Sequence, residues 1–196
     1  MRGRFIIVEG VNGVGKTSTL NKALSTLNGD HFGYSKGFTN NFSWDRFINS
    51  RPHSFTYYLD LVYKTAAVIR PTLMQGRHII QDRYVQTVDS FLPDCESAYN
   101  KAFRILFNPL FLEPDLYIHF YAEVDTIAAR LRASATDDYR LDLAVNPDKI
   151  KERESRYKQI YDTLARPKHV LNTTEKPVEG CANELIDIIR RELKCL

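Results

Sequence analysis

One segment near the N-terminus has the composition of a phosphate-binding loop. It reads Gly10-Val11-Asn12-Gly13-Val14-Gly15-Lys16-Thr17 and fits the pattern G-x-x-x-x-G-K-[ST] without a mismatch. Glycines let consecutive backbone N–H groups point at phosphate oxygens, and the lysine adds a mobile positive charge for the β and γ phosphates. The Thr17 hydroxyl can ligate Mg²⁺, and Ser18 extends the loop. The segment therefore predicts binding of a nucleoside triphosphate together with Mg²⁺.

A carboxylate and a guanidinium stand side by side at Asp82-Arg83-Tyr84, directly after the apolar segment His78–Gln81. If that segment is a strand parallel to the one before the phosphate-binding loop, both motifs lie at the same edge of the sheet. Mg²⁺ prefers oxygen ligands and keeps several waters, so Asp82 is the expected complement to Thr17, directly or through water. Arg83 is then placed to reach the transferring phosphoryl group or an acceptor's phosphate.

Three further arginines are candidates for catalysis. Arg130 and Arg132 end a predicted helix, and Arg140 lies in the polar segment Ser134–Asn146. Phosphoryl transfer spreads negative charge over the equatorial oxygens, which guanidinium groups stabilise. Because Ser134–Asn146 is charged and aperiodic, we expect an exposed, lid-like loop over residues 134–146 that brings arginines to the site and excludes water.

The elements that must position these residues alternate along the chain. The apolar patterns predict strands at Arg4–Val8, Phe32–Ser35, His78–Gln81, Leu116–Phe120 and His169–Leu171. They predict helices at Lys16–Leu27, Pro52–Gln75, Val85–Phe107 (interrupted at Pro93), Val124–Ala133, Asp148–Leu164 and Val178–Leu193. Gly37–Ser50 is expected to be a loop with a short helix. This alternation favours an α/β fold with a mainly parallel sheet covered on both faces, and ligands beyond the carboxyl ends of its strands.

Composition sets the class of protein but not its ligand. The chain has 196 residues, 43% of them hydrophobic and 26% charged, with a net charge of +3. One domain over residues 1–196 is the expected organisation. No apolar run approaches the roughly 18 residues that a membrane helix needs, and the three cysteines lack metal-ligand spacing. We expect a cytoplasmic protein with reduced thiols whose partners are small-molecule nucleotides, with no nucleic acid and no membrane.

These motifs and their spacing resemble the thymidylate kinase family of P-loop nucleoside monophosphate kinases. The matching segments are Phe5–Ser18, Val68–Val85, Glu113–Arg132 and Ile150–Leu164. The resemblance implies a three-layer P-loop kinase fold with a five-stranded parallel sheet flanked by helices, and a homodimer. It also implies ATP as the phosphate donor, Mg²⁺, and a nucleoside monophosphate acceptor, most directly thymidylate (dTMP + ATP to dTDP + ADP).

The resemblance also assigns roles to individual residues. Because Gly13 stands where some members carry an arginine, the catalytic arginine should come from the segment that holds Arg130, Arg132 and Arg140. The donor base should pass near Asn172 and Pro177. The acceptor-side residues it implies are Asn12, Lys36, Phe38, Phe55, Tyr58, Arg83 and Thr87.

The departures from the family pattern cluster on the acceptor side. The family usually has Asp where this chain has Asn12, and an arginine that reads the base where it has Leu61. The usual S-S-x-A-Y-Q stretch is replaced by Thr87–Leu92. A pocket lined by Leu61 and by Val88 and Leu92 from that stretch is more apolar. Either the acceptor differs, or aromatic residues such as Phe38, Trp44, Phe55 and Tyr58 read it by stacking; core packing is the alternative role for these aromatics.

Two other functions stay open on sequence grounds. A deoxynucleoside kinase-like enzyme would phosphorylate a neutral hydroxyl and benefit from a carboxylate base at the end of the second strand. This chain has Ser35-Lys36 there, with the cations of Arg46, Arg51 and Arg83 available to an anionic acceptor, although Glu9 or Asp45 could serve as a base. A regulatory protein that binds nucleotide without efficient transfer is the second alternative.

Overall fold

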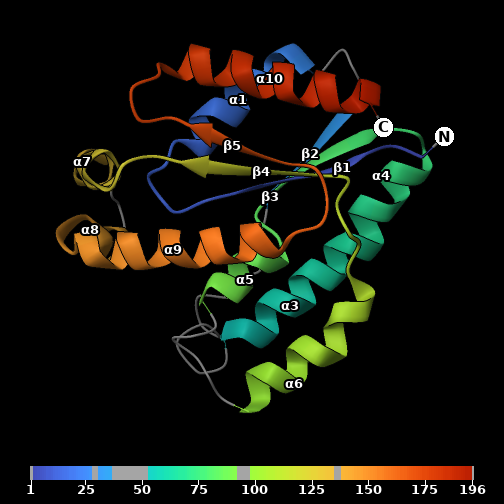
Figure 1. Cartoon of the computed structure of the whole chain (residues 1–196). Coiled ribbons are helices and arrows are strands. Elements are labelled where there is room, and N and C mark those ends of the chain that lie inside the picture. The colour runs from blue at the N-terminus through green and yellow to red at the C-terminus, as the bar shows by residue number, and fades with distance from the viewer. Residues whose placement is uncertain (1, 28–30, 37–52, 92–97, 135–137, 196) are drawn as a thin grey trace.

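A parallel sheet of five strands forms the centre of the molecule (Figure 1). The computed structural model describes residues 2–27, 31–36, 53–91, 98–134 and 138–195, without the side chains of 53–56, 91, 98–101, 103, 138, 139 and 195. The strands are β1 (Phe5–Glu9), β2 (Phe32–Lys36), β3 (His78–Asp82), β4 (Leu116–Tyr121) and β5 (Lys168–Asn172). Their order is β2-β3-β1-β4-β5, and every neighbouring pair is parallel.

Helices cover both faces of the sheet, which confirms the expected three-layer α/β architecture. They are α1 (Lys16–Leu27), α3 (His53–Lys64), the π-helix η2 (Thr65–Ile69), α4 (Arg70–Met74), α5 (Val85–Phe91), α6 (Ala98–Phe107), the 3-10 helix η4 (Asn108–Leu110), α7 (Val124–Ser134), α8 (Asp138–Val145), α9 (Pro147–Thr163) and α10 (Val178–Cys195). In Figure 1, α1 and α10 lie on one face, α3 and α5 on the other, and α7 beyond the arrowhead of β4. None of the described helices is both long and apolar enough to span a membrane.

Two apolar clusters hold the layers together. One joins β1 and β4 to α1 and α10, and the other joins the opposite face of β1 and β3 to α3 and α5. The central strand β1 contributes to both, because its side chains alternate between the faces and all five residues are buried. Burial on both faces explains why the strands read as short continuous apolar runs in the sequence.

The five predicted strands and six predicted helices are confirmed to within a few residues. Gly37–Ser50, expected to be a loop with a short helix, lies outside the described residues. One long helix has an informative irregularity. His53–Met74 is helical throughout, but Thr65–Ile69 forms a π turn in which the Arg70 N–H donates to the Thr65 carbonyl. Pro71 follows at once and has no N–H to donate, and its ring clashes with the carbonyl four residues earlier in a regular α-helix. The wider turn accommodates this proline without ending the helix.

The prediction of an exposed loop over Ser134–Asn146 is wrong, because Asp138–Val145 forms α8. Residues 135–137 lie outside the described chain. The helix packs against α7, and among its described side chains, those of residues 140–145, only Leu143 and Ala144 are buried. So narrow an apolar face gives little periodicity in the sequence, which is why the segment reads as a loop.

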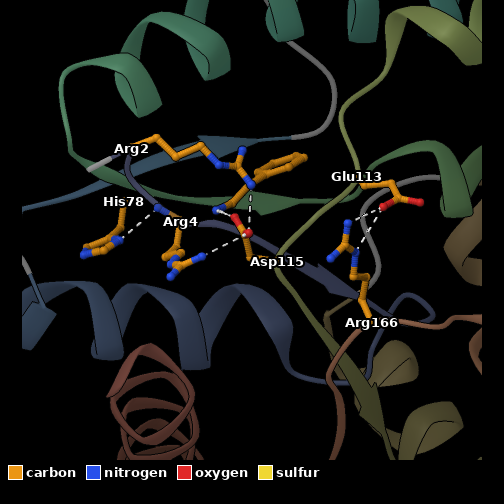
Figure 2. A network of polar contacts seen from close by, with 7 residues as sticks. Arg2, Arg4, His78, Glu113, Asp115 and Arg166 are labelled. Atoms are coloured by element: carbon orange, nitrogen blue, oxygen red, sulfur yellow. Dashed lines mark hydrogen bonds and ion pairs between the residues drawn. The ribbon is translucent and has the colours of Figure 1, made fainter. Parts of the chain in front are cut away.

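A polar network fixes the amino ends of the strands, at the edge opposite the phosphate-binding loop. Figure 2 shows Asp115 at its centre, where it accepts the backbone N–H of Phe5 (2.8 Å) and pairs with Arg2 (2.8 Å) and Arg4 (3.5 Å). The Asp115 N–H donates in return to the Phe5 carbonyl at 2.7 Å. The carboxylate thus locks the start of β1 to the chain that leads into β4.

Asp115→Ala should therefore lower the free energy of unfolding by about 2 kcal/mol, because it leaves the buried Phe5 N–H without an acceptor. Glu113→Ala is the matched control. Glu113 pairs with Arg166, also in Figure 2, but the two side chains are 75% and 54% exposed, so the loss should stay within about 0.5 kcal/mol. Urea unfolding measures both. Equal losses in the two variants would contradict a special role for Asp115.

Candidate functional site

The phosphate-binding loop is held in place by its close approach to neighbouring elements. It connects β1 to α1, and its glycines Gly10, Gly13 and Gly15 have φ of 139°, 83° and 96°. A Cβ on Gly10 would lie 2.4 Å from the Phe120 carbonyl oxygen of β4, and one on Gly13 would lie 2.8 Å from Cγ of Leu131 on α7. Only glycine fits these two positions. Val11 and Val14 point into the core, where they anchor the loop.

Lys16 lies at the first turn of α1 and is nearly fully buried. Its ammonium donates to the carbonyls of Gly10 and Val11, the latter at 3.0 Å. Burial, and then the nearby guanidinium of Arg83, lowers the pKa of Lys16 to about 7. An anion beside this ammonium would favour its charged form. A phosphate group bound beside Lys16 would therefore stabilise its positive charge.

Asp82, at the end of β3, offers an oxygen to a metal ion. The Tyr34 hydroxyl donates to its Oδ2 at 3.4 Å, whereas its buried Oδ1 has no hydrogen-bond partner among the described residues. Thr17 is exposed at the start of α1, and nowhere in the described ranges do three or more His, Cys, Asp or Glu side chains gather to hold a metal. The oxygens of Asp82 and Thr17 fit Mg²⁺, which is usually bound by few protein oxygens and completes its coordination with phosphates and water.

Arg83 links the end of β3 to the phosphate-binding loop. Its φ is 67°, an uncommon conformation for a residue other than glycine. Its backbone N–H donates to the Val8 carbonyl at 3.0 Å, and its guanidinium donates to Oδ1 of Asn12. The left-handed backbone thus turns the chain at the edge of the sheet and directs this arginine toward the loop. Strained residues of this kind often lie at functional sites.

The buried carboxylate of Glu9, which the sequence offered only as a possible base, has a supporting role beneath the phosphate-binding loop. Glu9 accepts the Tyr84 N–H at 2.7 Å and the Thr87 hydroxyl, and this hydroxyl also lies 3.2 Å from that of Tyr157 on α9. Burial raises the pKa of Glu9, and the bonds from Thr87 and Tyr84 oppose the rise. Both carboxylate oxygens are thus engaged in joining β1 to α5. Thr87, predicted to bind substrate, takes part in this support.

Among the three candidate arginines, Arg130 bonds to the phosphate-binding loop. It donates to the carbonyl of Thr173 at 2.7 Å, to its hydroxyl at 3.0 Å, and to the Val14 carbonyl at 3.4 Å. Thr173, directly after β5, donates from its own hydroxyl to Val14 at 2.7 Å. Thr173 lies in the segment from Asn172 to Pro177 that was expected near the donor base, but its contact with the phosphate-binding loop was not predicted.

The other two candidate arginines lie on or beside α8. Arg132 donates from Nε to the Ala144 carbonyl at 3.2 Å and so holds α7 against α8. Arg140 is exposed on α8. Their catalytic roles stay predictions, and the Arg132 contact also gives that residue a structural role.

The remaining residues predicted to bind the donor or the acceptor lie in several parts of the structure. Tyr58 is fully buried, with its ring centroid 6.0 Å from those of Phe107 and Phe111, as expected for core packing. Lys36 ends β2 beside Asp82. Ser18 and Pro177 are exposed, and Asn172 accepts the Thr174 N–H at 2.9 Å. Phe38 and Trp44, and the side chain of Phe55, lie outside the described residues.

The bond from Thr87 to Glu9 predicts a pH-dependent effect on stability. Thr87→Val removes a donor to a buried carboxylate, which should raise the pKa of Glu9 further and destabilise the fold by about 1–2 kcal/mol at about pH 8. A raised folded-state pKa means that stability is lost as pH rises from the unfolded value through the folded value. The deficit of the variant should therefore shrink toward about pH 5.

Urea unfolding at the two pH values measures this difference. Thr87→Ser keeps the hydroxyl and should remain close to the parent protein at both. A deficit for Thr87→Val that is the same at the two pH values would show that the hydroxyl does not act on the charged carboxylate.

Comparison with known proteins adds two findings. The chain is 29% identical to the thymidylate kinase of Methylobacillus flagellatus over an alignment of length 218. The alignment covers 97% of this chain and 98% of that protein. Its fold is similar to a solved structure of thymidylate kinase from Candida albicans, with a TM-score of 0.75, 18% identity, and coverage of 98% and 93% of the two chains. No family model matches the chain. Together with the phosphate-binding loop and the strand order, these likenesses identify the chain as a nucleotide kinase related to the thymidylate kinase family.

Proposed function

We propose that the chain transfers the γ-phosphoryl group of ATP, with Mg²⁺, to a nucleoside monophosphate, with thymidylate as the first candidate (dTMP + ATP to dTDP + ADP). One arrangement carries this proposal. Three features lie together at the carboxyl edge of the sheet. They are Lys16, the pair formed by Arg83 and Asn12, and Oδ1 of Asp82, which has no hydrogen-bond partner among the described residues. A triphosphate and a second phosphate can meet there.

On the donor side, the backbone N–H groups of the loop and the start of α1 bind phosphate oxygens. Lys16 balances the charge of the β and γ phosphates. Thr17 and Asp82 would hold Mg²⁺, which when bound neutralises charge that develops on the phosphate oxygens. Arg130, fixed by Thr173 and Val14, lies on the side of the loop where α7 and β5 end.

On the acceptor side, the arrangement favours a phosphate over a hydroxyl. A monophosphate is already anionic and needs cations rather than a general base. Glu9 uses its carboxylate to accept from Tyr84 and Thr87, and β2 ends in Ser35-Lys36 without an acid. Lys36 lies in register with Asp82 on the neighbouring strand, so a cation and a metal ligand flank the same space.

These contacts say less about which base the acceptor nucleotide carries. Leu61 and Val88 are buried in the apolar cluster between the sheet and α3, and they offer no hydrogen bond to a base. The Candida albicans thymidylate kinase is described as having broad substrate specificity. We therefore propose thymidylate as the first acceptor to test and other monophosphates after it.

We further propose a cytoplasmic homodimer. Large apolar side chains are exposed along the helical stretch from α3 to α4 and on α6: Leu59, Tyr63, Met74, Ile105 and Leu106. Such a surface is typical of a protein interface. Light scattering should give twice the 22.7 kDa of one chain, and the mass of a single chain would refute the dimer.

An ADP-release assay across nucleosides and their monophosphates tests the proposed reaction. ADP release should depend on a monophosphate and on Mg²⁺. Lys16→Met should abolish it while the protein stays folded, and Asp82→Asn should reduce it by about 100-fold or more. Release with nucleosides alone would instead indicate a deoxynucleoside kinase-like enzyme. Slow ATP hydrolysis that no acceptor changes would indicate a regulatory nucleotide-binding protein.

A further inference from the structure

A buried ammonium lies at the carboxyl end of β2, outside the residues that the motifs single out. Lys64 is the last residue of α3, and its side chain is 3% exposed. Its Nζ donates to the backbone carbonyl of Lys36, the last residue of β2, and lies 3.1 Å from Oδ2 of Asp60 one turn earlier. The pair therefore joins α3 to the end of an edge strand.

Stability alone is a poor reason to bury this charge. Burial lowers the pKa of Lys64, while the Asp60 carboxylate opposes the shift. Replacing a buried ion pair by apolar residues is often neutral or stabilising. The neighbouring positions Leu61 and Thr65 on the same helix are fully enclosed, so an apolar side chain at position 64 would suit the surroundings. A role in the site explains this buried charge better than stability does.

The place of β2 in the sheet suggests that role. β2 is an edge strand that pairs only with β3 within the described sheet, so its far side gains no ladder bonds. Lys36 and Asp82 are partners in the register of this pair. Lys64, bonded to the Lys36 carbonyl, holds the end of the strand from the helix side and fixes where Lys36 lies relative to Asp82.

We infer that Lys64 is a positioning residue for the acceptor phosphate: it fixes the end of β2 so that Lys36 stands beside Asp82 and meets the phosphate of an incoming monophosphate. The inference rests on the proposed function. Lys64 acts through the backbone of β2, by its bond to the Lys36 carbonyl.

The test compares Lys64→Met with Lys64→Arg and with a matched control, Lys168→Met. Lys168 also donates to backbone carbonyls, those of Tyr161 (2.8 Å) and Asp162 (3.2 Å), but it lies at the start of β5, at the opposite edge of the sheet. Calorimetry measures the binding of thymidine monophosphate, thymidine and ATP to each variant. Initial rates give the KM for the monophosphate.

Lys64→Met should weaken monophosphate binding and raise its KM by about tenfold, the size expected for loss of one charge-assisted contact. Thymidine and ATP affinities should change by less than about twofold. Lys64→Arg should recover part of the loss, and Lys168→Met should change none of these values. In the ligand-free protein, amides of β2 should exchange hydrogen faster in Lys64→Met than in Lys168→Met. If Lys64→Met does not fold, Lys64→Gln replaces it, with the same selective loss expected.

Three results would overturn the inference: unchanged monophosphate affinity in a folded Lys64 variant, an equal loss for thymidine and its monophosphate, or the same loss in Lys168→Met. Other results would refute the proposed function independently of the inference about Lys64. A parent protein that binds the monophosphate but releases no ADP removes the transfer reaction and leaves the Lys64 comparison intact. A parent protein that binds no monophosphate removes both.

Discussion

The seating of the phosphate-binding loop between β4 and α7 is the constraint on which the site depends. Gly10 passes so close to the Phe120 carbonyl that no side chain fits, and Gly13 does the same against Leu131. Once the loop is seated, its Val14 carbonyl accepts from Thr173 and Arg130. These contacts join β5 and α7 to the loop, so the parts of the donor side are fixed relative to each other before any ligand arrives.

The second organising feature is the amount of charge buried at one edge of the sheet. Glu9, Lys16, Lys64 and Asp82 are all buried in the described protein. Burial raises the pKa of Glu9 and lowers the pKa values of Lys16 and Lys64. Each shift records a cost of desolvation that hydrogen bonds and opposite charges offset only in part. Phosphate groups and Mg²⁺ would complete this balance, so the same burial that is costly in the free protein favours ligand binding.

Local sequence patterns were enough to predict the phosphate-binding loop, the parallel sheet and the position of Asp82. The loop and Asp82 are marked by short runs of adjacent residues, and the parallel sheet by the alternation of strands and helices along the chain. The supporting contacts were missed because they join distant residues: Thr87 to Glu9, Thr173 to Val14, and Lys64 to Lys36. No spacing rule connects such pairs. The helix α8 was missed for a different reason. Among its described side chains only Leu143 and Ala144 are buried, and so narrow an apolar face leaves little periodicity in the sequence.

The central claim is that the carboxyl edge of the sheet holds a donor and an acceptor nucleotide at once, with their phosphates facing each other. Calorimetry with adenosine joined to thymidine through a polyphosphate bridge tests it most directly. Because one molecule would fill both subsites, its affinity should exceed that of ATP or thymidine monophosphate by about 100-fold or more, and each of them should compete with it. An affinity no higher than that of ATP, with competition by ATP alone, would contradict the account.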